Sequence, residues 1–290
     1  MINSNGNLAK FLHVVFKQMS KNYDIFLVID GVEGVGKSRG LLLNILDYWY
    51  RRCLKYKKIP KWAINIDVKD WVNNLNNANQ KEMIGLDEAG DSMDSMQFAN
   101  KFNRLLYQAY TIIREKLSFS IVVLPSFFDL SSRFRKRRVR FLIHGYKRVD
   151  NRCNKCGYEF VGDSCPKCKS KNFKRGFLMF EIYDRQRINM ILEYNLYRHT
   201  KKVRCGVAPL VRGTVREYQG ELADYYSELK KQKMKEVLDK LSDNVNDLKG
   251  VKSCPHSSWR YVKKSNSWYC RSCGKEVFSN PYENGGVDNE

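Results

Sequence analysis

The chain lacks any apolar run of 18 residues, so the sequence predicts no membrane-spanning helix. Its first ten residues are polar and lack the basic-then-apolar order of a signal peptide, which favours a cytoplasmic location. Acidic residues are few beside basic ones, with 31 Asp and Glu against 52 Lys and Arg, a net charge of +21. Such an excess favours a polyanionic partner, either nucleic acid or an acidic membrane face.

Histidine is also scarce, with four residues in 290. His13, His144 and His199 have no metal-binding or nucleophilic partner nearby in the sequence, which argues against catalysis by histidine. Cysteine is more frequent, and seven of the nine cysteines fall in metal-ligand spacings, leaving Cys53 and Cys205 alone. This pattern indicates zinc in a reducing compartment rather than disulfides.

Apolar runs alternate with helical periodicities through the first half of the chain. We expect strands at 25–30, 62–68, 83–88, 119–126 and 139–145, and helices at 8–19, 41–49 and 95–116. Residues 127–138 are basic and form a loop or helix. The alternation predicts an α/β fold with three layers, in which a parallel sheet is covered by helices on both faces.

The pattern changes after residue 150, and the sequence predicts four segments. Residues 1–150 form the α/β core, and 151–212 form a β-rich extension that carries a cysteine hairpin. Residues 213–250 form a charged helix, and 251–290 form a second cysteine module with an acidic tail. Within the extension, we expect β-structure at 176–183 and at 188–194.

A glycine-rich segment follows the first expected strand, with the sequence Gly31-Val32-Glu33-Gly34-Val35-Gly36-Lys37-Ser38. Glycines at this spacing let the backbone curl so that its N–H groups point at a phosphate, and the next helix adds its dipole. This is a P-loop, in which Lys37 would bridge the β- and γ-phosphates of ATP and Ser38 would hold Mg²⁺. The predicted nucleotide-binding residues are Gly31, Gly34, Val35, Gly36, Lys37, Ser38 and Arg39.

Two carboxylates end the strand expected at 83–88. Asp87 would hold the Mg²⁺ shell, and Glu88 would polarise the water that attacks the γ-phosphate. An acidic pair alone is weak support, because any strand can end in solvated carboxylates. Together with the P-loop, about fifty residues before it, the pair predicts a P-loop NTPase that hydrolyses ATP.

This tandem pair resembles the P-loop ATPases that carry a catalytic glutamate beside the Mg²⁺ aspartate and an extra strand between the two motifs. That group includes AAA+ proteins, RecA-like helicases and FtsK–HerA-type DNA motors, and the resemblance covers residues 25 to about 149. It implies a γ-phosphate sensor at Ser126 and a homo-oligomer, such as a ring, in which an arginine reaches the neighbouring subunit. Arg133 and Arg135 are the candidates, although a basic surface that contacts nucleic acid explains this cluster equally well.

Shorter strings are similar to the Zot-like ATPases of viruses and mobile elements, which are related to the FtsK–HerA motors. They are Leu86-Asp87-Glu88-Ala89, a helix with Asn103, Arg104 and Arg114, and Leu124-Pro125-Ser126-Phe127-Phe128-Asp129-Leu130. The resemblance implies an assembly or genome-handling motor, working in the host cytoplasm if the chain is viral.

Two cysteine modules indicate zinc ribbons. Cys153-x2-Cys156 and Cys165-x2-Cys168 are separated by eight residues and would form a closed tetrahedral site. The second module is Cys254-x-His256 with Cys270-x2-Cys273, a three-cysteine, one-histidine site. The aromatic and basic residues inside the second module suit nucleic acid, a small ribbon core or a protein-docking face.

These features favour an ATP-hydrolysing motor acting on DNA, for packaging or translocating the genome of a virus or mobile element. A replication helicase or an AAA+ helicase loader is the alternative. A nucleotide kinase is suggested by residues 29–34, which resemble the loop of thymidylate-type kinases, but the acidic pair and the zinc modules argue against it. A nucleic-acid-binding scaffold with a vestigial ATP site is a further alternative.

Overall fold

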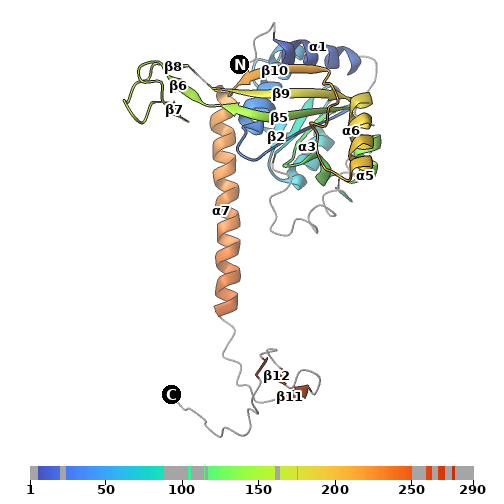
Figure 1. The fold of residues 1–290 in the computed structure, drawn as a ribbon, viewed down its shortest axis with the longest axis vertical. Coiled ribbons are helices and arrows are strands. Elements are labelled where there is room, and N and C mark those ends of the chain that lie inside the picture. The colour runs from blue at the N-terminus through green and yellow to red at the C-terminus, as the bar shows by residue number, and fades with distance from the viewer. Residues whose placement is uncertain are drawn as a thin grey trace. The chain divides into compact units, whose positions relative to one another are not determined.

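The computed structural model describes residues 6–19, 24–87, 104–105, 114, 117–160, 164–174, 176–249, 259–262, 267–271 and 276–277. The chain divides into two compact units, Met1–Lys231 and Gln232–Glu290 (Figure 1). Among the described residues, no helix is long and apolar enough to cross a membrane.

The larger unit is built on a seven-stranded sheet with the order β10-β9-β5-β1-β4-β3-β2. Five of these strands pair in parallel with one another: β1 (Ile25–Gly31), β2 (Ile64–Asn65), β3 (Met83–Leu86), β4 (Phe119–Val123) and β5 (Phe141–Val149). The last two are antiparallel additions, β9 (Phe177–Asp184) beside β5 and β10 (Val211–Arg216) beside β9. The expected α/β class and mostly parallel sheet are therefore confirmed, and β4 lies between β1 and β3.

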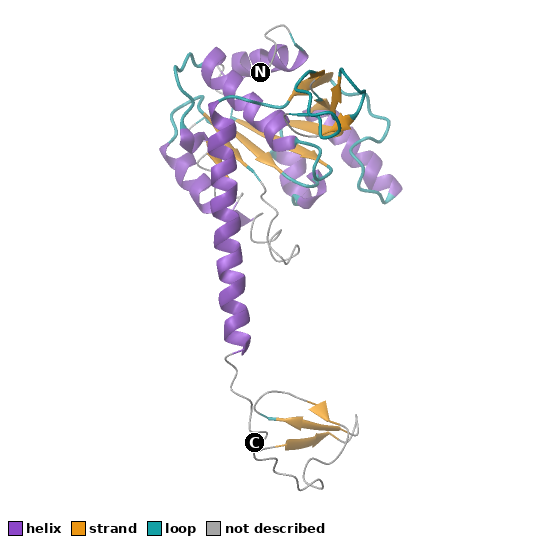
Figure 2. Ribbon diagram, turned by 90° about the vertical axis from the view of Figure 1, so that its left-hand side faces the viewer, coloured by secondary structure: helices purple, strands orange, loops and turns teal. Residues whose placement is uncertain are grey.

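Helices cover both faces of this sheet (Figures 1 and 2). Along β1, Ile25, Leu27 and Ile29 pack in one core, and Phe26 and Val28 pack in the other, because successive strand residues point to opposite faces. The first core is completed by α1 (Asn7–Met19) and the consecutive helical segments η1 (Lys37–Leu42), α2 (Leu43–Tyr48) and η2 (Trp49–Cys53). The second core is completed by α3 (Val68–Asn77), α5 (Ser132–Arg137) and α6 (Arg185–Arg198).

The sheet continues beyond residue 150, where the sequence placed the end of the core. Because β9 and β10 belong to the same sheet as β1, the expected boundary falls inside the larger unit. The cysteine hairpin is an insertion between β5 and β9, with its own three-stranded sheet in the order β7-β6-β8. Its strands are β6 (Asn151–Cys153), β7 (Glu159–Phe160) and β8 (Phe173–Lys174).

Residues 188–194 were expected to be β-structure, and this prediction is wrong because they lie in α6. The isoleucines at 188 and 191 suggested a strand, but with Leu192 they are buried at the i, i+3, i+4 spacing of a helix. The helix begins at Asp184, whose carboxylate accepts a hydrogen bond from the backbone N–H of Arg187 at 3.0 Å. A cap of this kind outweighs the strand preference of the β-branched residues.

The strand expected at 62–68 is also shorter than predicted. β2 contains only Ile64 and Asn65, after a 3₁₀ turn, η3 (Lys61–Ala63). The carboxylate of Asp67 then accepts from the N–H of Lys69 at 2.8 Å and starts α3, which ends the extended segment. Of the helix expected at 95–116, only residues 104–105 and 114 are described, and all three are helical.

The charged helix expected at 213–250 is α7 (Glu221–Lys249), and its residues up to Lys231 belong to the larger unit. Residues 213–216, expected to be helical, instead belong to strand β10. The smaller unit contains a three-stranded antiparallel sheet of β11 (Trp259–Val262), β12 (Ser267–Cys270) and β13 (Glu276–Val277). Tyr261 faces Trp268 across this sheet, with ring centroids 5.3 Å apart.

Candidate functional site

The glycine-rich loop leaves the carboxyl end of β1 in a conformation that requires glycine. Gly31, Gly34 and Gly36 have φ values of 138°, 73° and 94°, a region that other residues rarely adopt. At Gly31 there is a second reason, because a Cβ atom there would lie 2.1 Å from the carbonyl oxygen of Gly145 on β5. Only glycine therefore lets the loop turn this close to the neighbouring strand.

Lys37 and Ser38 begin the helical segment η1 directly after this loop. The Lys37 ammonium group donates to the carbonyl oxygens of Gly31 and, at 3.2 Å, of Val32, so it lies over the loop. The Ser38 hydroxyl donates to Oδ1 of Asp87 at 2.9 Å. Asp87 is completely buried at the end of β3, and the fold thus joins two predicted magnesium ligands that are 49 positions apart.

The fold also brings α7 to Asp87, which the sequence did not indicate. The Tyr226 hydroxyl donates to Oδ2 of Asp87, and the Lys230 ammonium nitrogen lies 3.7 Å from the same oxygen. Their i, i+4 spacing predicts that they share one face of the helix. No local signal, however, shows which part of the molecule that face contacts.

A cavity of 670 Å³ adjoins these groups, within the range of small-molecule sites. Five basic side chains line it, against three acidic ones: Lys37, Arg39, Arg148, Lys230 and Lys231, with Glu33, Asp87 and Glu217. The positive excess suits a polyphosphate, and the hydroxyl and carboxylate oxygens of Ser38 and Asp87 suit Mg²⁺. The residues present therefore fit a magnesium-bound nucleotide.

A second cavity of 390 Å³ shares several residues with the first, but Asp87 is not among the residues that line it. Arg39 lies at the junction, where it is held by Glu217 at 3.3 Å and by the Ser227 hydroxyl at 2.7 Å. Phe173 and Phe177 add aromatic surface, and Val35 also lines this cavity. Of the predicted contacts, Val35 thus lines the smaller cavity alone, whereas Arg39 lines both cavities.

The predicted sensor and arginine finger lie on the segment after β4. The Ser126 hydroxyl accepts from the N–H of Phe128 at 3.2 Å and caps the short turn η4 (Phe127–Asp129), while the neighbouring Leu124 and Pro125 line the larger cavity. The guanidinium of Arg135 donates to the carbonyl oxygens of Phe128 and Leu130 at 2.5 and 2.6 Å.

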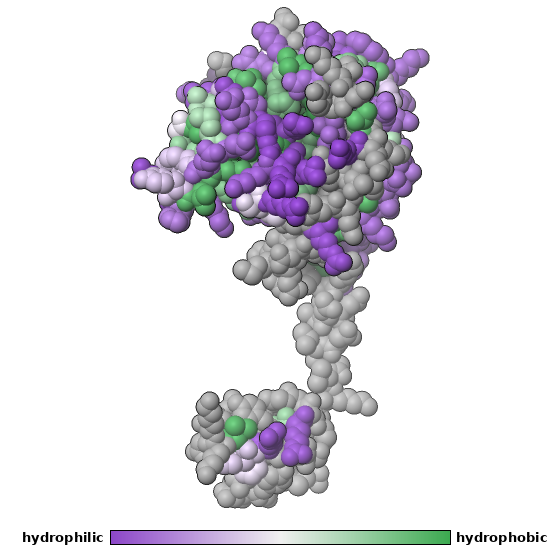
Figure 3. Space-filling model, turned by 90° about the vertical axis from the view of Figure 1, so that its right-hand side faces the viewer, coloured by the Kyte–Doolittle hydropathy of each residue, from purple (hydrophilic) through white to green (hydrophobic). Residues whose placement is uncertain are grey.

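These contacts favour a structural role for Arg135, which fixes the turn between η4 and α5. Burial lowers the pKa of its guanidinium, while Asp129 acts in the opposite direction. Arg133 is exposed on α5 and is the more accessible of the two finger candidates. Figure 3 views the side of the larger unit on which α5 and α6 lie in Figure 1, and hydrophilic side chains cover much of it.

Two further predictions concern acidic and histidine side chains near this edge. Glu88, the predicted water-polarising carboxylate, lies outside the described residues. His144, for which the sequence showed no metal-binding or nucleophilic partner, has its Nδ1 2.8 Å from Oδ1 of buried Asp30. Asp30 also accepts the N–H of Phe127 at 3.1 Å, so it ties β1 to β5 and to η4 beside the loop.

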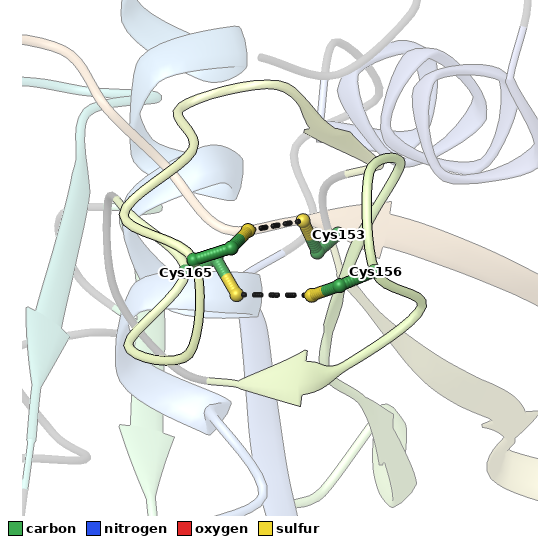
Figure 4. A group of neighbouring side chains, drawn as sticks. Cys153, Cys156 and Cys165 are labelled. Atoms are coloured by element: carbon green, nitrogen blue, oxygen red, sulfur yellow. Dashed lines mark hydrogen bonds between the residues drawn. The ribbon is translucent and has the colours of Figure 1, made fainter.

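The four cysteines of the hairpin converge as predicted. Their sulfur atoms all lie within 4.8 Å of one another, and Figure 4 shows those of Cys153, Cys156 and Cys165 pointing inward. The pairs Cys153–Cys168 and Cys156–Cys165 are each 3.5 Å apart. Zn–S bonds of about 2.3 Å would place tetrahedral sulfurs about 3.8 Å apart, so this cluster could hold zinc with little adjustment.

The C-terminal module is described only in part. Cys270 is buried at the end of β12, whereas Cys254, His256 and Cys273 lie outside the described residues. The second zinc site therefore stays a prediction. The first site has its ligands in place, with Phe160 and Phe173 packed beside them at a centroid distance of 5.1 Å.

We expect Cys165→Ser to remove one equivalent of zinc from the purified protein, because three ligands cannot close the site. The hairpin should then become sensitive to proteolysis between residues 151 and 174, since the metal and a few apolar side chains hold it together. Metal analysis and limited digestion would measure both effects. Cys53→Ser is the matched control, and an unchanged zinc content in Cys165→Ser would refute the site.

Neither the known family models nor the curated proteins yield a match to this chain. Function must therefore be inferred from the chemistry of the two places just described. One is a basic cavity beside a glycine loop, where a serine meets a buried aspartate. The other is a set of four thiols at metal-ligand distances on an inserted hairpin.

Proposed function

We propose that the chain is a P-loop ATPase that acts as a motor on DNA. The observation that carries the proposal is the hydrogen bond of 2.9 Å between Ser38 and Asp87, formed beside Lys37 and the glycine loop. These residues come from distant parts of the sequence and meet at the carboxyl ends of β1 and β3, where ligands bind in parallel α/β sheets. The basic lining of the adjoining cavity also supports a polyphosphate ligand.

In this proposal each side chain has a defined task. Bound Mg²⁺ would supply positive charge to the phosphates and orient them for attack. Lys37 would exchange the carbonyl oxygens of Gly31 and Val32 for phosphate oxygens, while Ser38 and Asp87 would hold the metal. Glu88, next in the chain, would polarise water, and Ser126 and an arginine such as Arg133 would sense or neutralise the terminal phosphate.

The strand order supports an ATPase of the catalytic-glutamate group over a nucleotide kinase. β4 lies between β1 and β3, so an extra strand separates the glycine loop from Asp87. That is the arrangement implied by the resemblance to AAA+, RecA-like and FtsK–HerA-type ATPases. A kinase has no evident use for the acidic pair or for the cysteine hairpin.

DNA as the partner is supported by charge. The chain carries +21, and the cysteine hairpin exposes one acidic side chain, Glu159, among its described residues. On the same hairpin five basic side chains are exposed: Arg152, Lys155, Lys167, Lys169 and Lys171. Translocation or packaging of a mobile genome by an oligomer is the form of motor that we propose, with a replication helicase or helicase loader as the alternative.

The proposal predicts ATP hydrolysis that increases when DNA is added. Phosphate release should be measured with and without double- and single-stranded DNA, and DNA affinity should fall steeply as salt rises, because phosphate contacts release counterions. Phosphoryl transfer to a nucleoside monophosphate would instead identify a kinase. DNA binding without any hydrolysis would identify a scaffold, and either result would refute the motor.

A further inference from the structure

We propose that Lys230, on α7, is a phosphate-binding residue that leaves Asp87 for the terminal phosphate when ATP and Mg²⁺ bind. This inference rests on the proposed function, and it assigns a residue that no sequence motif marks. Lys230 lies 3.7 Å from Oδ2 of Asp87 and lines the same cavity as Lys37. The two lysines reach this cavity from separate elements, one from the loop and one from α7.

The position of Lys230 follows from how the start of α7 is anchored. Leu222 and Tyr226 are buried in the first core, with exposed fractions of 3% each. The Arg39 guanidinium donates to the Ser227 hydroxyl at 2.7 Å, which joins the helix to η1. These contacts fix the turns of α7 that immediately precede Lys230. The fold therefore directs the Lys230 side chain to the site.

Electrostatics favours two positions for the Lys230 ammonium group, one beside Asp87 and one on a bound phosphate. Asp87 is fully buried, and the Lys230 ammonium group lies close enough to compensate part of its charge. Once Asp87 and Ser38 held Mg²⁺, the Asp87 carboxylate would be compensated by the metal, and the Lys230 ammonium group would be repelled by the like charge. A triphosphate beside the metal supplies the negative charge to which the lysine can move, and its flexible four-carbon side chain, 34% exposed, can make that move.

The layout of the cavities identifies which phosphate Lys230 would contact. The smaller cavity, with Phe173 and Phe177, adjoins Arg39 and suits the base and sugar. Asp87 and Lys230 line the larger cavity and are absent from the lining of the smaller one. The phosphate chain would therefore run past Lys37 and end near Lys230, so that Lys230 contacts the γ-phosphate, which ADP lacks.

The test compares ATP with ADP. Equilibrium affinities of fluorescent ATP and ADP analogues in the presence of Mg²⁺ should be measured for the wild type, Lys230→Met and Lys230→Arg. Loss of one charged hydrogen bond is expected to weaken ATP binding about 10-fold or more in Lys230→Met, while ADP binding stays within about two-fold because Lys230 makes no contact with ADP. Lys230→Arg should restore most of the preference for ATP.

Lys235→Met is the matched control, since it removes the same charge from an exposed position further along α7. Circular dichroism and zinc content establish that each variant is folded. An equal loss for ATP and ADP, or no loss in a folded Lys230→Met, would overturn the role of Lys230 and leave the ATPase proposal intact. Absence of nucleotide binding by the wild type would instead overturn the proposed function, and this inference with it.

Discussion

Replacing Lys37 by alanine is expected to lower ATP hydrolysis by about 100- to 1,000-fold, the loss typical of removing one preorganised electrostatic contact to the reacting group. Its ammonium group already lies over the loop, held by the carbonyl oxygens of Gly31 and Val32. Little reorganisation is needed before it meets a phosphate. Nucleotide binding should weaken in parallel, which titration calorimetry or a fluorescent analogue would measure.

The matched control for this substitution is Lys17→Ala. Lys17 is exposed on α1, so its removal changes the net charge equally without touching the cavity. Hydrolysis at the wild-type rate in a folded Lys37→Ala protein would contradict the assignment of the glycine loop as a phosphate site. A similar loss in both variants would show that overall charge, rather than the contact, is responsible.

The Glu88→Gln variant should bind ATP normally but hydrolyse it about 100- to 10,000-fold more slowly, as expected when a general base is removed. Glutamine keeps the size of the side chain and its hydrogen bonding but cannot accept the proton of the attacking water. ATP should therefore stay bound and unhydrolysed, and rapid filtration followed by separation of ATP from ADP would detect it. The prediction rests on the position of Glu88 directly after Asp87 in the chain.

Glu193→Gln provides the corresponding control, because Glu193 is exposed on α6, on the other side of the sheet from η1. Normal turnover by Glu88→Gln would remove Glu88 from its proposed role and shift attention to another carboxylate near the cavity, Glu33 or Glu217. Lost binding together with lost turnover would indicate that Glu88 holds the site together instead of activating water.

Local signals predicted the parts of the site that lie on continuous segments. The glycines at 31, 34 and 36 mark positions where the backbone needs positive φ, and an apolar run before them marks a buried strand. Four cysteines in two short spacings likewise predict their own convergence. In each case the residues that act together lie close to one another in the sequence, so their spacing is enough to predict that they meet in the fold.

The parts that the sequence could not predict depend on contacts between distant segments. Tyr226 and Lys230 read as members of a charged helix, because nothing in that helix indicates that its first turns pack beside Asp87. The sheet's extension by β9 and β10 was hidden by the inserted hairpin, which changes the composition after residue 150. The sequence does not distinguish Arg135 from its basic neighbours, because its structural role depends on hydrogen bonds to two backbone carbonyl oxygens.

The two edge strands of the seven-stranded sheet constrain how copies of this protein could associate. At one end, β2 offers only two residues. At the other, β10 carries Arg212 and Arg216, and the side-chain amide of Asn7 donates to the backbone oxygen of Arg212 at 2.7 Å. Edge strands that are short, that carry charged side chains, or whose backbone groups are already hydrogen-bonded resist pairing with a strand of another molecule. If copies of the chain associate as the proposed oligomer, they would therefore meet through side chains and not by pairing these two edge strands.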